Sequence, residues 1–198
     1  MSLDHLWAGW RSAYVSWVSE ADGPQPSPEE ASRLDASGPH GLARPAASSA
    51  DTDDEESSCV FCRIFSSGLP DETRFVVWEG AHTVVLLNAY PYASGHVLVM
   101  PTRHVGDLGD LEPDESAEIW ETARRAVRAI QVAYSPDGCN LGANLGRAAG
   151  AGIPRHVHLH ALPRWVGDTN FMTSVASTRV LPEALQDSWA KLRDAWPA

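Results

Sequence analysis

Three histidines occupy alternate positions in the segment His156-Val157-His158-Leu159-His160. Residues at i, i+2 and i+4 of an extended strand project from one face, so the three imidazoles are predicted to line a single surface, about 7 Å apart at each step. The intervening Val157 and Leu159 are then expected to face the core. A half-buried strand needs only some polar residue at each exposed position, and three histidines are a rare way to fill them. The segment therefore predicts a chemical site.

Histidines gathered on one face can carry out group transfer to and from phosphorus. A neutral imidazole can attack phosphorus and leave again, which divides one difficult displacement into two easier ones. This chemistry needs one ring nitrogen with its lone pair available and an acceptor that holds the proton on the other. A second histidine can act as an acid toward the leaving phosphate, an effect worth roughly 10²–10⁴-fold in rate. A rival interpretation is that the three histidines hold a catalytic zinc with an open water position.

The pair Cys59 and Cys62, in Cys-Val-Phe-Cys, is a candidate metal site. Two thiolates three positions apart can hold one zinc ion, and two further ligands must then come from elsewhere in the chain. His104 and one histidine of the triple run are the candidates. Four protein ligands would leave no open position, so such a zinc would be structural. The alternative is that both cysteines are small buried hydrophobic residues.

A glycine-rich loop at 146–152 directly precedes the histidine run. Glycines allow backbone N–H groups to approach an anion closely, and Arg147, Arg155 and Arg164 add local positive charge. These features predict a site for a small polyphosphate. The net charge of −11 argues against binding to a nucleic-acid duplex, whose phosphates require a basic surface.

The elements that must position these residues are predicted from apolar spacing. Strands are expected at 75–78, 83–87, 96–100 and near 140–144, and one long helix over 113–134. A last helix is expected to begin near residue 182 and to carry Leu185, Trp189, Leu192 and Trp196. Strands around a central helix, with helical ends, indicate an α+β fold with a mainly antiparallel sheet.

Composition divides the chain into three parts. Residues 1–20 are predicted to contain an amphipathic helix from their spacing of large apolar side chains, whereas residues 21–58 are predicted to be a disordered linker rich in Pro, Ser and acidic residues. Residues 59–198 then form the folded domain with its C-terminal helical extension. No apolar run reaches the roughly 20 residues of a membrane helix, and no signal peptide is recognisable, so the protein is expected in the cytoplasm without membrane contact.

The run His156-Val-His-Leu-His-Ala-Leu162 resembles the motif of the histidine triad (HIT) superfamily of nucleotide hydrolases and transferases. The similarity extends over residues 59–171. It includes Cys59-Val-Phe-Cys-Arg-Ile64, Asn88 followed by Gly95-His-Val-Leu-Val99, Pro101–His104 and Asn144. The resemblance implies a HIT-like fold and a homodimer, in which long helices pair and a sheet extends across the axis.

By this resemblance, each histidine has its own role. His158 would be the nucleophile that forms an adenylyl-histidine, and His160 and His96 would contact the phosphates. Asn88 would bind the ribose. His156 would join Cys59, Cys62 and His104 on a structural zinc, and no organic cofactor is implied. The nucleotide and phosphate contacts are expected from these residues: Asn88, Asn144, Gly150, Gly152, Arg147, Arg164 and Trp165.

Finer features resemble one branch, the actinobacterial diadenosine tetraphosphate phosphorylases. These are Leu87-Asn-Ala-Tyr-Pro-Tyr92, Asn144-Leu-Gly146 and Pro163–Phe171. Hydrolytic members usually carry glutamine four positions before the first histidine, where this chain has Gly152. The glycine leaves room for inorganic phosphate as the second nucleophile, which favours phosphorolysis of diadenosine tetraphosphate to ATP and ADP. A hydrolase, a nucleoside phosphoramidase, a nucleotidyltransferase with another acceptor and a non-catalytic nucleotide-binding regulator remain alternatives.

Overall fold

The computed structural model describes residues 58–168 and 183–197. The chain divides into two compact units, one of residues 7–63 and one made of residues 1–6 and 64–198. The predicted N-terminal helix and nearly all of the predicted linker lie outside the described residues. Of the first unit, the structure describes only 58–63, the beginning of helix α4 (Val60–Ser66). No helix in the described part of the chain is long and apolar enough to span a membrane, and the cytoplasmic location stays a prediction.

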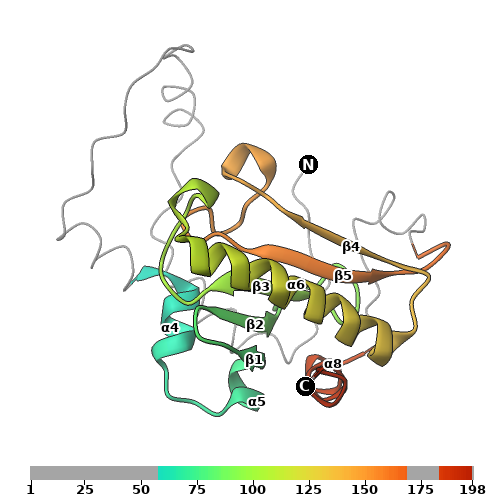
Figure 1. The fold of residues 1–198 in the computed structure, drawn as a ribbon. Helices are drawn as coiled ribbons and strands as arrows, with labels where there is room; N and C mark the ends of the chain where they lie inside the picture. Colours follow the sequence, from blue (N-terminus) through green and yellow to red (C-terminus); the bar gives the residue numbers. More distant parts are fainter. Residues whose placement is uncertain (1–57, 169–182, 198) are drawn as a thin grey trace, which may run out of the picture. The chain divides into compact units, whose positions relative to one another are not determined.

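The second unit is built on a five-stranded antiparallel sheet (Figure 1). Its strands are β1 (Val76–Glu79), β2 (Thr83–Leu87), β3 (Val97–Pro101), β4 (Gly138–Ala143) and β5 (Leu159–Arg164). They lie in the order β1-β2-β3-β5-β4, so β5 is inserted between β3 and β4. This order places β5, which carries His160, between β3 and the edge strand β4, with Leu98 opposite His160.

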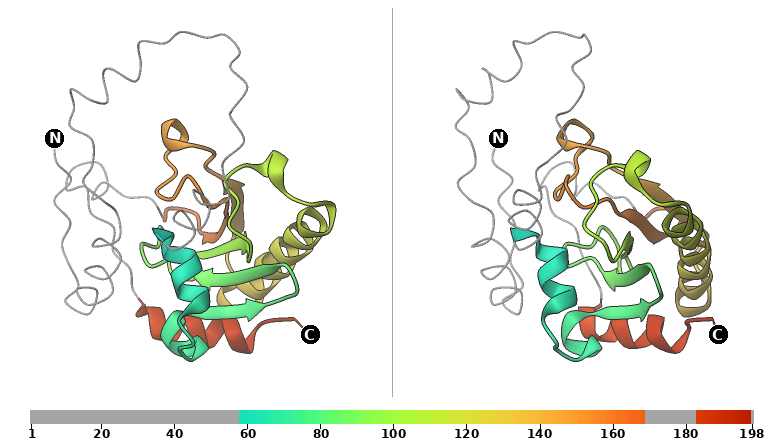
Figure 2. Two further views of the ribbon diagram at one scale, coloured as in Figure 1. Left: turned by 90° about the vertical axis from the view of Figure 1, so that its left-hand side faces the viewer. Right: turned by 60° about the vertical axis from the view of Figure 1, so that its left-hand side comes forward.

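Helix α6 (Pro113–Tyr134) lies across one face of the sheet, as both views of Figure 2 show. Pro113 stands at its first position, and Glu112 and Glu115 form a reciprocal capping box that satisfies its first amides. Alternate residues of the central strands face this helix and form the core with it: Val85, Leu87, Val97, Val99, Leu159 and Ala161. Because side chains alternate along a strand, His160 points to the opposite face.

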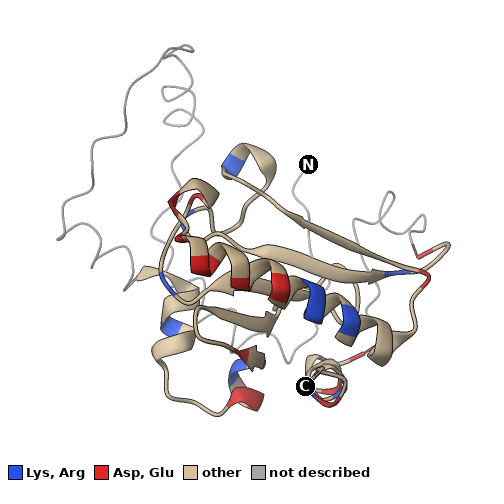
Figure 3. Ribbon diagram, viewed as in Figure 1, with Lys and Arg blue, Asp and Glu red and all other residues tan. Residues whose placement is uncertain are grey.

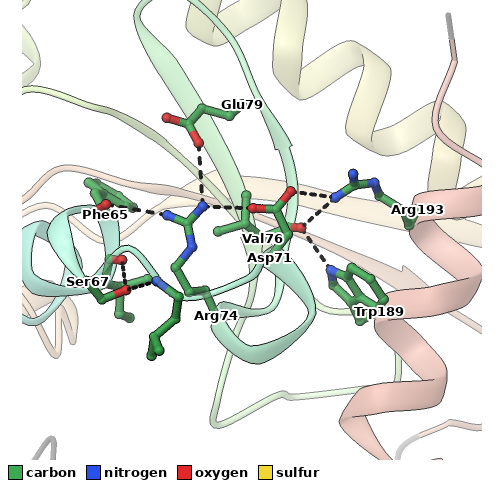
Figure 4. A network of polar contacts seen from close by, with 10 residues as sticks. Phe65, Ser67, Asp71, Arg74, Val76, Glu79, Trp189 and Arg193 are labelled. Atoms are coloured by element: carbon green, nitrogen blue, oxygen red, sulfur yellow. Dashed lines mark hydrogen bonds and ion pairs between the residues drawn. The ribbon is translucent and has the colours of Figure 1, made fainter.

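The C-terminal helix α8 (Leu185–Asp194) packs against α6, β1 and β2 and completes the core with Leu185 and Leu192. A polar network also holds it to the short helix α5 (Asp71–Arg74) and to β1 (Figure 4). Asp71 accepts from Arg74 at 2.7 Å and from Arg193 at 2.8 Å, and the Trp189 indole donates to the Val76 carbonyl at 2.8 Å. Helix α8 is therefore a structural part of the unit.

The predicted α+β fold with a mainly antiparallel sheet is confirmed. The central helix spans the predicted residues, and the second strand has the predicted bounds. One expectation was wrong, because the histidine run does not lie within a single strand: β5 begins only at Leu159. Before that point the Val157 amide donates to the Val105 carbonyl at 2.7 Å, and His158 Nδ1 lies 2.8 Å from the His156 carbonyl. These two contacts hold residues 157 and 158 in place of the hydrogen bonds of a strand ladder.

Candidate active site

His96 and His160 form a directly bonded pair at the centre of the sheet. His96 precedes β3, is fully buried, and accepts at Nδ1 from the Tyr92 backbone amide at 3.1 Å. A neutral imidazole that accepts at Nδ1 carries its proton on Nε2. His96 Nε2 lies 3.0 Å from His160 Nδ1, so the His96 proton is donated to His160. The same reasoning then places the proton of His160 on its own Nε2.

His160 presents this Nε2–H group as a donor. The atom is buried, and among the described residues it has no hydrogen-bond partner. Burial of the ring, and secondarily the neighbouring His158, lower the pKa of His160 to about 4. The imidazole is therefore neutral near pH 7 and offers a hydrogen-bond donor rather than a positive charge. A phosphate oxygen is an acceptor that such a donor can satisfy.

His158 lies beside this pair, with its ring centroid 5.0 Å from that of His160. Its Nδ1 lies 2.8 Å from the backbone carbonyl of His156. A carbonyl can only accept, so Nδ1 carries the proton and Nε2 carries the lone pair. This is the tautomer that nucleophilic attack through Nε2 requires.

His156 is fully buried and faces a different environment. Its Nε2 lies 2.9 Å from the carbonyl of Pro101, which fixes the proton on Nε2 and leaves the lone pair on Nδ1. The ring of His104 stands perpendicular to it, with the ring centroids 5.3 Å apart. Phe65, at the end of α4, contacts the His156 ring edge-on with centroids 5.9 Å apart. The triple run is thus divided, because His156 turns to His104 while His158 turns to His160.

The glycine-rich loop forms a compact turn before the histidine run. Gly146 and Gly150 have positive φ angles of 77° and 88° around a single 3₁₀ turn, η3 (Arg147–Ala149). Asn144 reaches into this turn and donates to the Gly150 carbonyl at 3.5 Å. Gly152 is exposed, and a Cβ built on it would meet no atom within 4 Å. The position therefore has the open space that the sequence predicted.

Asn88 contacts His96. Its carbonyl oxygen accepts from the Tyr90 amide at 2.9 Å, and its amide nitrogen lies 3.4 Å from His96 Nδ1. The side chain thus stabilises the turn that leads to His96. The predicted ribose contact by Asn88 stays a prediction.

Two predicted phosphate ligands lie away from the histidines. Arg164 is at the far end of β5, about 13 Å along the strand from His160. Its guanidinium contacts Asp168 at 2.6 Å and Asn140 at 2.8 Å. Trp165 packs against Tyr134, with ring centroids 6.4 Å apart. The structure therefore does not bring Arg164 together with the glycine loop.

Tyr92 is a site residue that residue-by-residue reasoning did not single out. Its ring stacks on His160 with a centroid distance of 5.8 Å and lies 4.7 Å from His96, while its amide fixes the His96 tautomer. The turn-rich loop between two strands was visible in the sequence, but its contact with β5 depends on strand order. That order places residues 92 and 160 together, and no local pattern carries it.

The fold thus brings together the bonded pair His96–His160 and His158, whose lone pair lies on Nε2. The family model described as "HIT domain" matches residues 70–166. An uncharacterized HIT-like protein of Mycobacterium tuberculosis is 32% identical over 146 residues, which cover 69% of this chain and 99% of that one. The chain belongs to the HIT family.

Two further relatives bear on the site. A protein named AP-4-A phosphorylase from M. tuberculosis is 41% identical over 128 residues, which cover 65% of this chain and 66% of that protein. A solved structure of a Zn-bound histidine triad family protein from Mycobacterium smegmatis is 33% identical, with a TM-score of 0.58. The match covers 71% of this chain and 94% of that one. The match thus covers slightly less than two thirds of the length of the relative named AP-4-A phosphorylase.

Proposed function

We propose that the protein transfers a nucleotidyl group through His158, and that its reaction is phosphorolysis of diadenosine tetraphosphate to ATP and ADP. The observation that carries the proposal is the contact of His158 Nδ1 with the His156 carbonyl, which directs the lone pair to Nε2. The 41% identical relative named AP-4-A phosphorylase supports the choice of substrate. The enzyme class and the substrate are both parts of this one proposal.

The reaction has two balanced steps. His158 Nε2 attacks the phosphorus next to one adenosine, so that a P–N bond forms, the P–O bond to the rest of the substrate breaks, and ATP leaves. A phosphate oxygen then attacks the adenylyl-histidine, the P–N bond breaks, and ADP leaves. His160, neutral because of its lowered pKa, donates a hydrogen bond from Nε2 to a phosphate oxygen in both steps.

His96 acts on the reaction through His160. Both of its ring nitrogens have partners within the protein, the Tyr92 amide and His160 Nδ1. We therefore propose that His96 positions His160 and does not contact phosphate as the sequence led us to expect. It fixes the tautomer and orientation of the ring that faces substrate.

The test of the acceptor is a product assay on purified protein. With diadenosine tetraphosphate and phosphate, ATP and ADP are expected, and an acid-labile AMP adduct should be trapped on the wild type but not on His158→Ala. Equal release of AMP with and without phosphate would sink the phosphorylase proposal in favour of a hydrolase. Nucleotide binding with neither an adduct nor any turnover would indicate a nucleotide-binding regulator.

Gly152 offers a sharper test of the same choice. Because a Cβ there meets nothing within 4 Å, Gly152→Gln is expected to fold normally. The variant carries glutamine at the position where hydrolytic members of the family usually have it. It should therefore shift the products from ATP and ADP toward ATP and AMP. Gly138→Gln, at the other end of β4 opposite Arg164 and also with open space, serves as the matched control and should leave the product ratio unchanged.

We propose in addition that Cys59, Cys62, His104 and His156 hold a structural zinc. Each side chain offers one thiol sulfur or imidazole nitrogen as a ligand. His156 fits this role, because a metal-binding histidine typically donates its other ring N–H to a carbonyl, and Nε2 of His156 does so to Pro101. The Zn-bound relative from M. smegmatis supports the same assignment. The ion would stabilise the fold and leave the chemistry to His158.

A homodimer is the proposed assembly. Strand β4 is an edge strand with mostly exposed residues, and Leu141 is exposed on it. Trp120, 58% exposed, and Val132 project from α6. Acidic residues gather in the first half of this helix and basic residues in the second half, as Figure 3 shows. Two antiparallel copies of α6 would therefore pair opposite charges around the exposed tryptophan.

A further inference from the structure

The Gly95–His96 turn rests directly on the ring of Tyr134, the last residue of α6. Gly95 has a φ of 78°, and a Cβ built on it would lie 2.4 Å from Tyr134 Cε2. The absence of a side chain at Gly95 thus allows the ring to contact the backbone of the turn. Any displacement of the ring toward the sheet is transmitted to His96, the next residue.

Tyr134 is itself held from the side of α8. Its hydroxyl donates to Glu183 at 2.7 Å, and the Ser188 hydroxyl donates to the same carboxylate oxygen at 2.7 Å. Lys191 forms an ion pair with Glu183, and its ammonium lies 5.6 Å from the Tyr134 ring centroid. The carboxylate therefore fixes the tyrosine to the C-terminal helix through several bonds.

The turn that Tyr134 supports is tied to the reacting histidines. The His96 carbonyl accepts from the Asn88 amide at 2.9 Å, and the His96 amide lies 3.2 Å from the Ala93 carbonyl, so the backbone is fixed on both sides. From the ring of His96, one hydrogen bond leads to His160. A continuous series of contacts thus joins Glu183, Tyr134, Gly95, His96 and His160.

We propose that Tyr134 is a positioning residue for the His96–His160 pair, and that Glu183 at the start of the C-terminal helix holds it in place. The proposal rests on the proposed role of His160 as the donor to phosphate. The Gly95–His96 turn packs against the Tyr134 ring, and the hydrogen bond from the Tyr134 hydroxyl to Glu183 fixes the position of that ring. The C-terminal segment then contributes to the site without touching substrate.

The test combines imidazole ¹⁵N NMR with kinetics on the full chain. In the wild type, His160 should show the Nε2–H tautomer and remain neutral well below pH 6.5. Tyr134→Leu, which removes the ring, should give a mixture of His160 tautomers and raise its titration midpoint toward 6.5. In the same variant, kcat should fall roughly 10- to 100-fold with little change in KM. Tyr134→Phe and Glu183→Gln, which retain the ring, should show the same changes in smaller measure.

Trp189→Phe is the matched control. It removes a hydrogen bond between α8 and β1, but Trp189 bonds to Val76 and not to Tyr134. It should lower Tm while leaving the His160 spectrum and kcat unchanged. An unchanged His160 spectrum in Tyr134→Leu, or equal changes in Trp189→Phe, would overturn the proposal. If Tyr134→Leu does not fold, an unaltered His160 spectrum in both Tyr134→Phe and Glu183→Gln would overturn the proposal. The NMR result stands even if the wild type proves inactive on dinucleoside polyphosphates, which would count against the proposed function alone.

Discussion

His96 Nε2 and His160 Nδ1 lie 3.0 Å apart, and His96 is fully buried while it makes this bond. The residue proposed to contact substrate is therefore held by one whose two ring nitrogens both have partners within the protein. Replacing the His96 imidazole with a ring that lacks nitrogens should disturb the orientation of His160 rather than substrate binding. We therefore expect kcat to change with little change in KM.

His96→Phe retains a buried ring but leaves His160 Nδ1 and the Tyr92 amide without their partner. We expect kcat to fall about 100-fold, with KM changed by less than about threefold, because misplacement of a catalytic group acts on the transition state. Steady-state kinetics measure both constants. His82→Phe, at the exposed turn between β1 and β2, should leave both unchanged. A rise in KM alone would indicate direct substrate contact by His96.

The stability of the protein should fall as the pH falls from about 6.5 to about 4. The pKa of His160 is lowered from 6.5 to about 4 by burial in the native state, so the unfolded chain binds the proton first. Between these values the unfolded state holds more protons, and the free energy of unfolding decreases with acid. Urea titrations at several pH values measure this slope. His160→Asn should flatten the slope, and an unchanged slope would contradict the assignment.

Glu115 should be a large contributor to stability near neutral pH. It accepts from Arg103 Nε at 2.8 Å and Nη2 at 2.6 Å, and these bonds lower the pKa of Glu115 to about 2. Glu115→Gln is expected to cost about 2 kcal/mol of unfolding free energy. The contribution of the wild-type carboxylate should be lost as the pH falls from about 4.5 to about 2. The exposed Glu79→Gln should cost less than about 0.5 kcal/mol.

Removal of zinc should loosen the fold. Because all four positions of a structural zinc are filled by protein ligands, a chelator should lower Tm, and His156→Ala should bind less than one zinc per chain. Metal analysis and thermal unfolding measure the two effects. A protein that retains its Tm but loses activity on chelation would instead indicate the catalytic zinc of the rival interpretation.

Trp120→Glu should convert the proposed dimer to a monomer. A charge at the centre of an apolar contact between two α6 helices remains desolvated and unpaired, which disfavours association. Light scattering after size-exclusion chromatography measures the mass. Leu69→Glu, also at an exposed apolar residue but before α5, should leave the mass unchanged. A monomeric wild type would contradict the proposed assembly directly.

Local patterns predicted most of the secondary structure, because apolar spacing depends on the period of each element. The bounds of α6 and β2 follow from such spacing. The division of labour among the three histidines did not follow from periodicity, which treats His156, His158 and His160 as equivalent. The difference arises from contacts with Pro101, from a carbonyl within the run, and from His96. Only the resemblance to the family anticipated it.

Arg164 and Trp165, which were predicted to contact nucleotide or phosphate, lie away from the histidines. Arg164 was expected near phosphate because it is basic and close in sequence to the histidines. On a strand, however, four residues extend about 13 Å, and Asp168 and Asn140 occupy its guanidinium. The support of Gly95 by Tyr134 was also beyond prediction, because it joins residues 39 positions apart that only the packing of α6 on the sheet brings together.

The attachment of α8 has a consequence for the order in which the protein folds. The bond between Asp71 and Arg193 joins residues 122 positions apart, and that between Val76 and Trp189 joins residues 113 positions apart. During synthesis β1 can pair with β2 directly, but its partner in α8 becomes available only after almost the whole domain has been made. Contacts of such long range slow folding. β5 is made before residues 183–197, and by the proposed role of Tyr134 the site is fixed only once those residues have docked.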